Sequence, residues 1–157
     1  ELIPTGDTDP GVLDFVAGFS RDRLGKGVVI AKDTPNFIAN RVGVHAMMAT
    51  VDVMQEMGLT IEEVDAVTGP AIGRPKTATF KLGDLVGLDT LLHVADNLVP
   101  LVPDDEARDI FLAPDYLRRM VEKGLLGRKT GGGFYKMVKK PEKKILTLDL
   151  ETLGYRD

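Results

Sequence analysis

The sequence contains no cysteine and no tryptophan among its 157 residues. Without cysteine the chain has no disulfide scaffold, no thiolate nucleophile and no cysteine-ligated zinc or iron–sulfur site. It also lacks any apolar run near the roughly 20 residues that a membrane-spanning helix needs, and no signal peptide opens it. We therefore expect no membrane span, and the lack of cysteine and of a targeting signal favours the cytoplasm.

An excess of basic residues is missing as well. The 20 Lys and Arg residues are outnumbered by 24 Asp and Glu, which gives a formal net charge of −4. Nucleic-acid-binding domains are usually basic, so we expect no nucleic-acid partner. With 43% hydrophobic and 28% charged residues, the composition also excludes a disordered, collagen-like or coiled-coil chain. Because the sequence starts at Glu1 without a methionine, we expect a piece of a longer protein.

The first 33 residues predict the end of an α/β unit. Residues 1–5 have the pattern of the end of an extended element, and Asp9 followed by Pro10 is a typical helix start. Apolar residues then recur at helical spacing, and the helix is predicted to end near Gly25 to Gly27. A β-branched run at 28–31 predicts a short buried strand. Strand end, helix and strand together indicate the last piece of such a unit.

A helical bundle is predicted for the next hundred residues. A long helix over 36–57 carries apolar residues on several faces, which is typical of a helix in the middle of a bundle. Thr60 and Glu63 form the pattern of a capping box that opens another helix. Further helices are predicted over 77–86, over 89–99 and from Asp115 onwards, and a lysine-dense tail follows near the end of the chain.

Three groups of residues resemble functional motifs only superficially. Gly131–Gly133 follow Lys129 and Thr130, but a nucleotide-binding P-loop has its glycines before Lys-Thr and a helix afterwards. We therefore predict a tight turn that docks Phe134 and Tyr135 on the bundle. His45 and His93 have no second ligand at metal-binding spacing, so no metal site is expected. The carboxylates of Glu62, Glu63 and Asp65 are explained by the electrostatics of a helix start.

Asn40 is the strongest candidate for a functional side chain. It lies near the start of a helix that is otherwise largely apolar, where asparagine has poor helix propensity. It is either a catalytic amide donor that orients a substrate in a cleft, or a structural residue bonded to neighbouring backbone. The residues alone leave both interpretations open.

Four stretches, in this order, resemble the 3-hydroxyacyl-CoA dehydrogenases of fatty-acid β-oxidation. The first three residues, ELI, resemble the strand that carries the family's glutamate. Residues 33–41, DTPNFIANR, resemble its D-T-P-G-F-I-x-N-R signature. Residues 73–89 resemble its G-x-P-x-G-P-F…D-x-x-G-L-D stretch, and residues 127–135, GRKTGGGFY, resemble its G-(R/K)-K-T-G-x-G-F-Y block.

The resemblance implies a fold and a set of roles. It implies a mainly α chain, a helical bundle like the C-terminal domain of 6-phosphogluconate dehydrogenase, preceded by a short terminal piece of a Rossmann domain. It implies catalytic roles for Asn40 and Glu1, NAD bound mainly by a domain upstream, an acyl-CoA substrate and a homodimer. The expected divisions are 1–33 for the last piece of the NAD-binding domain, 34–137 for the helical domain and 138–157 for a linker toward a following module.

The chain departs from the family pattern at two places. Asn36 stands where the family usually has glycine, so the entry to the helix is expected to differ locally, and Lys76–Thr79 replace its usual small and proline residues. Two other functions remain open: a dimerisation module in which Asn40 has lost its catalytic importance, or a related dehydrogenase of free hydroxyacids. As part of a 3-hydroxyacyl-CoA dehydrogenase, the isolated chain is expected to be inactive, because it lacks the base and the nicotinamide site.

Overall fold

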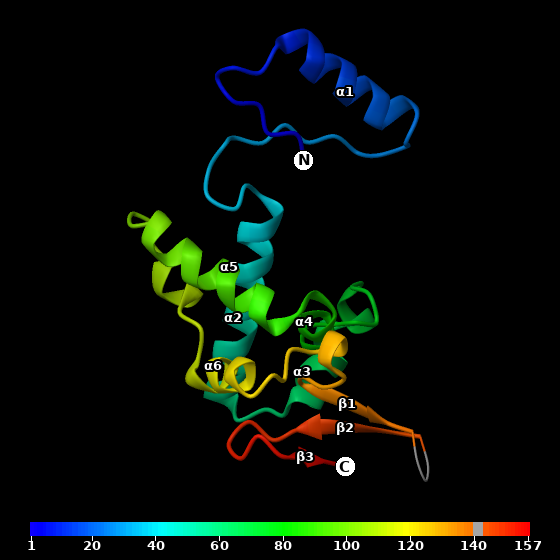
Figure 1. Ribbon diagram of the computed structural model, residues 1–157, viewed down its shortest axis with the longest axis vertical. Helices are drawn as coiled ribbons and strands as arrows, with labels where there is room; N and C mark the ends of the chain where they lie inside the picture. Colours follow the sequence, from blue (N-terminus) through cyan, green and yellow to red (C-terminus); the bar gives the residue numbers. More distant parts are fainter. Residues whose placement is uncertain (140–142) are drawn as a thin grey trace. The chain divides into compact units, whose positions relative to one another are not determined.

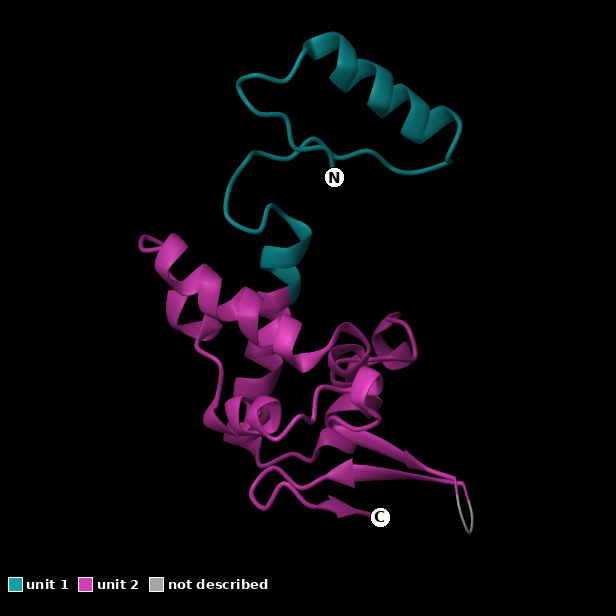
Figure 2. Ribbon diagram, viewed as in Figure 1, with its two compact units in different colours: residues 1–43 teal, residues 44–157 magenta. Residues whose placement is uncertain are grey.

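The computed structural model describes residues 1–139 and 143–157 (Figure 1). Residues 140–142, which fall in the predicted linker 138–157, lie outside this described part. The chain separates into two compact units, residues 1–43 and residues 44–157 (Figure 2). The boundary falls inside helix α2 (Ala39–Met57).

Unit 1 contains one full helix, α1 (Pro10–Asp22). The predicted cap is confirmed, because Asp9 Oδ1 accepts hydrogen bonds from the backbone N–H groups of Gly11 at 2.7 Å and Val12 at 3.3 Å. The helix ends at Asp22, a few residues before the predicted end.

The predicted buried strand at 28–31 is reduced to one parallel bridge between Leu2 and Ile30. Leu2 donates to the Val29 carbonyl and accepts from the Ala31 N–H, both at 2.8 Å. Val29 and Ile30 are 51% and 52% exposed, so the expectation of a buried strand is wrong except at Ala31. A bridge to a single neighbour leaves both faces of such a segment uncovered.

Unit 2 is built around the part of α2 that follows residue 43. Its buried side chains, Val44, Met48, Val51 and Met54, recur at helical spacing and form one stripe. Val53 and Met57 are 48% and 65% exposed. The prediction that this helix is buried on several faces is therefore wrong within this chain.

The other helices of unit 2 close a hydrophobic core against that stripe. Thr60 and Glu63 form the predicted capping box at the start of α3. The core is closed by large buried side chains such as Phe80, Phe111 and Phe134. The helices are α3 (Ile61–Thr68), α4 (Phe80–Val86), α5 (Leu88–Leu101) and α6 (Asp115–Glu122), with short 3₁₀ turns at η1 (Pro70–Ile72), η2 (Arg108–Phe111) and η3 (Arg128–Thr130). The mainly helical fold class is confirmed.

A small antiparallel sheet ends the chain. Its strands are β1 (Tyr135–Val138), β2 (Lys144–Leu148) and β3 (Tyr155–Arg156), in the order β1-β2-β3. Leu148 and Leu153 are buried in the core of unit 2, and Arg156 forms a two-pronged ion pair with Glu62 of α3 at 2.7 and 2.9 Å. The residues from 144 to 156, which the sequence placed in a linker, are thus packed on unit 2. Among the described residues, the lysines that indicated a linker are exposed: Lys136, Lys139, Lys143 and Lys144.

Candidate active-site residues and the motifs around them

The carboxylate of Glu1 lies at the start of helix α2. Its Oε1 accepts a hydrogen bond of 2.6 Å from the backbone N–H of Ala39, the first residue of that helix. The neighbouring Leu2 is held by the bridge to Ile30, which fixes the backbone next to Glu1. A negative charge is favoured at a helix N-terminus, where N–H groups lack intrahelical partners.

The turn that leads into α2 has an unusual backbone. Asn36 and Phe37 have φ values of 60° and 53°, in the left-handed region, and the Phe37 N–H donates to the Thr34 carbonyl at 2.9 Å. Asparagine enters this region more readily than other non-glycine residues. Asn36 can therefore replace the glycine of the family signature while the turn is kept, although α2 begins three residues later than predicted.

Asn40 is the second residue of α2, next to the residue that Glu1 holds. Its side chain is exposed and makes no hydrogen bond to the described part of the chain. The carbonyl and the amide group are therefore both accessible to a ligand. Both sequence-predicted site residues, Glu1 and Asn40, lie in unit 1 and meet through Ala39.

The two histidines are engaged elsewhere in unit 2. The His45 ring lies edge-on to Phe111, with ring centroids 6.0 Å apart, and His93 Nε2 lies 2.9 Å from the Asn97 amide nitrogen. Within residues 1–139 and 143–157, no three His, Asp or Glu side chains form a group suited to a metal ion. In the same ranges no helix is long and apolar enough to cross a membrane.

Asp84 joins two of the motifs that carry the family resemblance. It lies in α4, and its carboxylate accepts hydrogen bonds from the backbone N–H groups of Phe134 and Tyr135, both at 2.8 Å. A Cβ on Gly133 would lie 2.0 Å from Asp84 Oδ1, and one on Gly127 would lie 2.3 Å from the Asp84 carbonyl oxygen. The glycines of the GRKTGGGFY block thus allow the close approach of this loop to α4.

Burial raises the pKa of Asp84 to about 6, and the hydrogen bonds from Tyr135 and Phe134 offset part of that rise. The predicted docking of the aromatic pair is confirmed. Phe134 is 1% exposed, and its ring meets that of Phe80 edge-on at 4.7 Å.

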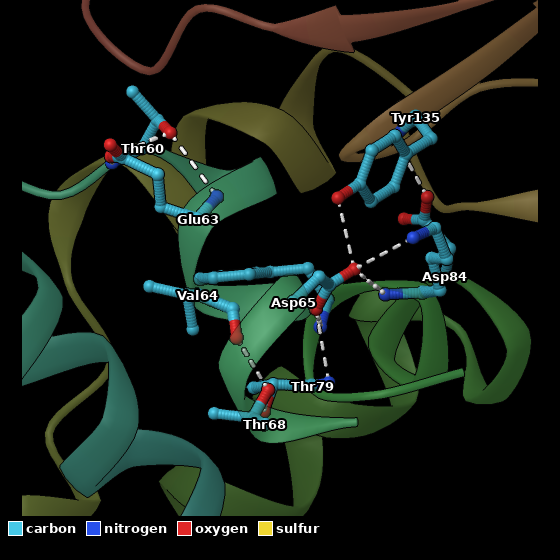
Figure 3. A network of polar contacts seen from close by, with 10 residues as sticks. Thr60, Glu63, Val64, Asp65, Thr68, Thr79, Asp84 and Tyr135 are labelled. Carbon is cyan, nitrogen blue, oxygen red and sulfur yellow. Dashed lines mark hydrogen bonds and ion pairs between the residues drawn. The ribbon is translucent and has the colours of Figure 1, made fainter. Parts of the chain in front are cut away.

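Asp65 is the centre of a buried polar network (Figure 3). Its Oδ1 accepts from the backbone N–H groups of Thr79 at 3.0 Å and Phe80 at 2.7 Å, and its Oδ2 accepts from the Tyr135 hydroxyl at 2.9 Å. Asp65 is 4% exposed and caps α4, which has no side-chain cap of its own. The explanation of Asp65 by its own helix start is therefore wrong.

The substituted segment before Phe80 is accommodated by the same network. Thr79 is 5% exposed, and its hydroxyl donates to Thr68 Oγ1 at 2.8 Å while its N–H donates to Asp65. Ala78 takes a φ of 49° in this turn. Thr79, one of the residues that differ from the family pattern, thus satisfies its buried polar groups within unit 2.

A cleft of about 390 Å³ lies beside this network. Within the cleft, Lys81 Nζ lies 4.9 Å from the centre of the Tyr135 ring. Met137 and Ile145, which pair across β1 and β2, form part of the wall of the cleft. Sequence reasoning missed this cleft, because the residues that line it come from segments far apart in the chain. Its lining residues are Lys81, Asp84, Arg128, Gly131, Tyr135, Met137 and Ile145.

Comparison with known proteins identifies the family. The family described as "3-hydroxyacyl-CoA dehydrogenase, C-terminal domain" matches residues 37–137, and the chain belongs to it. A protein of Bacillus subtilis named "Probable 3-hydroxyacyl-CoA dehydrogenase" is 50% identical over 99% of this chain and 19% of its own length. A 3-hydroxybutyryl-CoA dehydrogenase of Mycobacterium tuberculosis is 33% identical over 86% of this chain and 46% of its own length.

A solved structure supports the same assignment. The (S)-3-hydroxybutyryl-CoA dehydrogenase of Ralstonia eutropha matches with a TM-score of 0.71 and 30% identity, over 83% of this chain and 44% of that one. The chain thus spans between about a fifth and about a half of the length of these relatives.

Proposed function

We propose that this chain is the C-terminal part of an NAD-dependent dehydrogenase that interconverts 3-hydroxyacyl-CoA and 3-oxoacyl-CoA. The observation that carries the proposal is the exposed amide of Asn40 within the matched family segment, next to the helix start that Glu1 contacts. This amide makes no hydrogen bond to the described residues. A positioned amide donor can stabilise the charge that develops on a substrate oxygen. A carboxylate beside an imidazole fixes its tautomer and raises its basicity.

In this proposal Asn40 hydrogen-bonds the 3-oxygen or the thioester carbonyl of the acyl-CoA. Glu1 orients a histidine that belongs to the part of the enzyme upstream of this chain. NAD, when bound, supplies the hydride acceptor. The sequence has no glycine fingerprint for a dinucleotide, so we assign NAD binding to that upstream part and expect the isolated chain to be inactive.

The test is NADH oxidation with acetoacetyl-CoA by the full-length protein that carries this chain. Asn40→Ala is expected to lower kcat/KM by roughly 100-fold, the usual effect of losing one positioned donor. Asn97→Ala removes another helix asparagine, one that contacts His93, and serves as the matched control. If the Asn40→Ala variant is as active as the wild type, the proposed reaction stands but Asn40 has no catalytic role in it.

The same assay separates the other candidate functions. A full-length protein that reduces free 3-oxoacids but ignores CoA thioesters would be a dehydrogenase of free hydroxyacids. A protein that reduces neither would leave only the dimerisation module. Turnover by the 157-residue chain alone would contradict the assignment of the base and of NAD to another part of the enzyme.

We also propose that unit 2 forms the homodimer contact. Three apolar side chains of α4, those of Leu82, Leu85 and Val86, are between 43% and 53% exposed. Neighbouring exposed apolar side chains of this kind are typical of a protein–protein contact. Light scattering of the protein should give a molar mass twice that of the monomer. The Leu85→Lys variant should give the mass of the monomer. The cytoplasm remains our prediction for the compartment, to be tested by cell fractionation.

A further inference from the structure

One hydrogen bond joins the two proposed active-site residues through a single backbone group. Glu1 and Ala39 are 38 positions apart, yet Glu1 Oε1 lies 2.6 Å from the Ala39 nitrogen. Hydrogen bonds to an ionised carboxylate are shorter and about twice as strong as neutral ones. The next residue along α2 is Asn40, so whatever holds Ala39 also sets where the Asn40 side chain begins.

The helix start offers few other restraints on Asn40. The N–H groups of a first helical turn have no intrahelical acceptor, and the first helical bond here runs from the Val42 N–H to the Ile38 carbonyl. The preceding turn carries two non-glycine residues with positive φ, a conformation that costs energy. Glu1 therefore stabilises a helix start that follows a strained turn.

We propose that Glu1 is a positioning residue for Asn40, in addition to the role the proposed function gives it. One carboxylate oxygen anchors the first turn of α2, while Oε2, which makes no hydrogen bond to the described residues, is left for the imidazole. The inference rests on the proposed function, because it concerns the distance between the catalytic histidine and the amide of Asn40. A shared anchor keeps that distance constant, and misplacement by about 1 Å can cost roughly 100-fold in rate.

The contact can be tested in the 157-residue chain without any enzyme assay. In a ¹⁵N-resolved NMR titration, the Ala39 amide proton should move as the Glu1 carboxyl ionises, because a charged acceptor strengthens the bond. The movement should disappear in Glu1→Gln and persist in Asp14→Asn, which changes a carboxylate in the middle of α1. An Ala39 amide that ignores Glu1 would overturn the proposal.

The positioning role is tested in the full-length protein by removing only the donor. Ala39→Pro deletes the N–H at the first helical position, where proline is tolerated, and Ala39→Ser keeps it. We expect kcat with acetoacetyl-CoA to be at least about 10-fold lower for the proline variant than for the serine variant. KM for NADH should differ by less than about twofold, because the contact does not involve that site. Circular dichroism of both variants checks that the helices are retained.

Combination with Glu1→Ala, which removes the acceptor, completes the test. If the N–H acts through Glu1, Ala39→Pro should lower kcat no further in a Glu1→Ala background, so that the two changes are non-additive. Additive losses, or equal kcat for the proline and serine variants, would overturn the positioning role while the reaction stands. An inactive wild-type enzyme would instead remove the proposed function and this inference with it, whatever the NMR titration shows.

Discussion

The carboxylate of Asp65 caps a helix to which it does not belong: its Oδ1 accepts a hydrogen bond of 2.7 Å from the backbone N–H of Phe80, fifteen residues further along the chain. The same atom accepts from Thr79, and Lys81 Nζ lies 3.6 Å from Oδ2. One buried side chain therefore connects α3, α4 and, through the Tyr135 hydroxyl, the start of the sheet. We therefore expect unit 2 to depend on Asp65 more than on an exposed ion pair.

Asp65→Ala should lower the free energy of unfolding by about 3 kcal/mol or more, because it leaves at least two buried N–H donors without an acceptor. Urea denaturation followed by circular dichroism measures this change. Glu62→Gln, three residues earlier, weakens the partly exposed pair with Arg156 and the hydrogen bond with Thr147, and is expected to cost at most about 1 kcal/mol. Similar losses for the two variants would show that Asp65 is not the main connection.

Gly133→Ala should destabilise unit 2 by about 3 kcal/mol or more, since the added methyl group would overlap the Asp84 carboxylate. That carboxylate is held by two backbone hydrogen bonds, so moving it away would break them. Gly131→Ala, in the same loop, places its Cβ in open space at a φ of 80° and is expected to cost only about 1 kcal/mol. Thermal unfolding of the two variants compares them directly, and equal shifts would contradict the close approach.

The raised pKa of Asp84 makes a definite contribution to the pH dependence of stability. Folding raises this pKa from the ordinary value near 4 to about 6, so the folded state binds the proton more tightly than the unfolded one. The contribution is complete below about pH 4 and is lost as the pH rises through 6, by up to roughly 3 kcal/mol. Stability of the wild type relative to Asp84→Asn should therefore fall between pH 4 and 7. If the stability of the wild type relative to Asp84→Asn instead rises between pH 4 and 7, the two N–H donors lower the pKa of Asp84 by more than burial raises it.

Local signals in the sequence were sufficient for the starts of α1 and α3, whereas α2 begins three residues later than predicted. Asp9 with Pro10, and Thr60 with Glu63, place caps within three residues of the groups they bind, and all are found as predicted. Partners that are far apart in the chain could not be predicted in this way. Asp65 with Phe80 and Asp84 with Phe134 meet only because helices and loops pack, and no spacing rule connects them.

The packing of the end of the chain on unit 2 could not be predicted from local signals either. The high density of lysines around 136–144 indicated a linker, and the short apolar run that follows them was too weak a signal to indicate a strand. Leu148 and Leu153 nevertheless belong to the core. In the proposed active site, the motif indicated Asn40 and Glu1, but the hydrogen bond from Ala39 to Glu1 depends on the bridge between Leu2 and Ile30. That bridge joins two segments separated by a whole helix.

The exposure of Asn40 gives a last prediction that separates its two interpretations by stability alone. An exposed side chain without a bond to the described residues contributes little to folding, so Asn40→Ala should change the free energy of unfolding by no more than about 0.5 kcal/mol. A structural asparagine bonded to neighbouring backbone would instead cost about 1–3 kcal/mol when removed. Thr50→Ala removes a hydroxyl that does bond to the backbone of α2, at 2.7 Å to the Ala46 carbonyl, and shows what such a loss costs in the same helix. If Asn40→Ala is as destabilising as a lost buried bond, the residue supports the helix; if it is neutral while activity falls, it acts on the substrate.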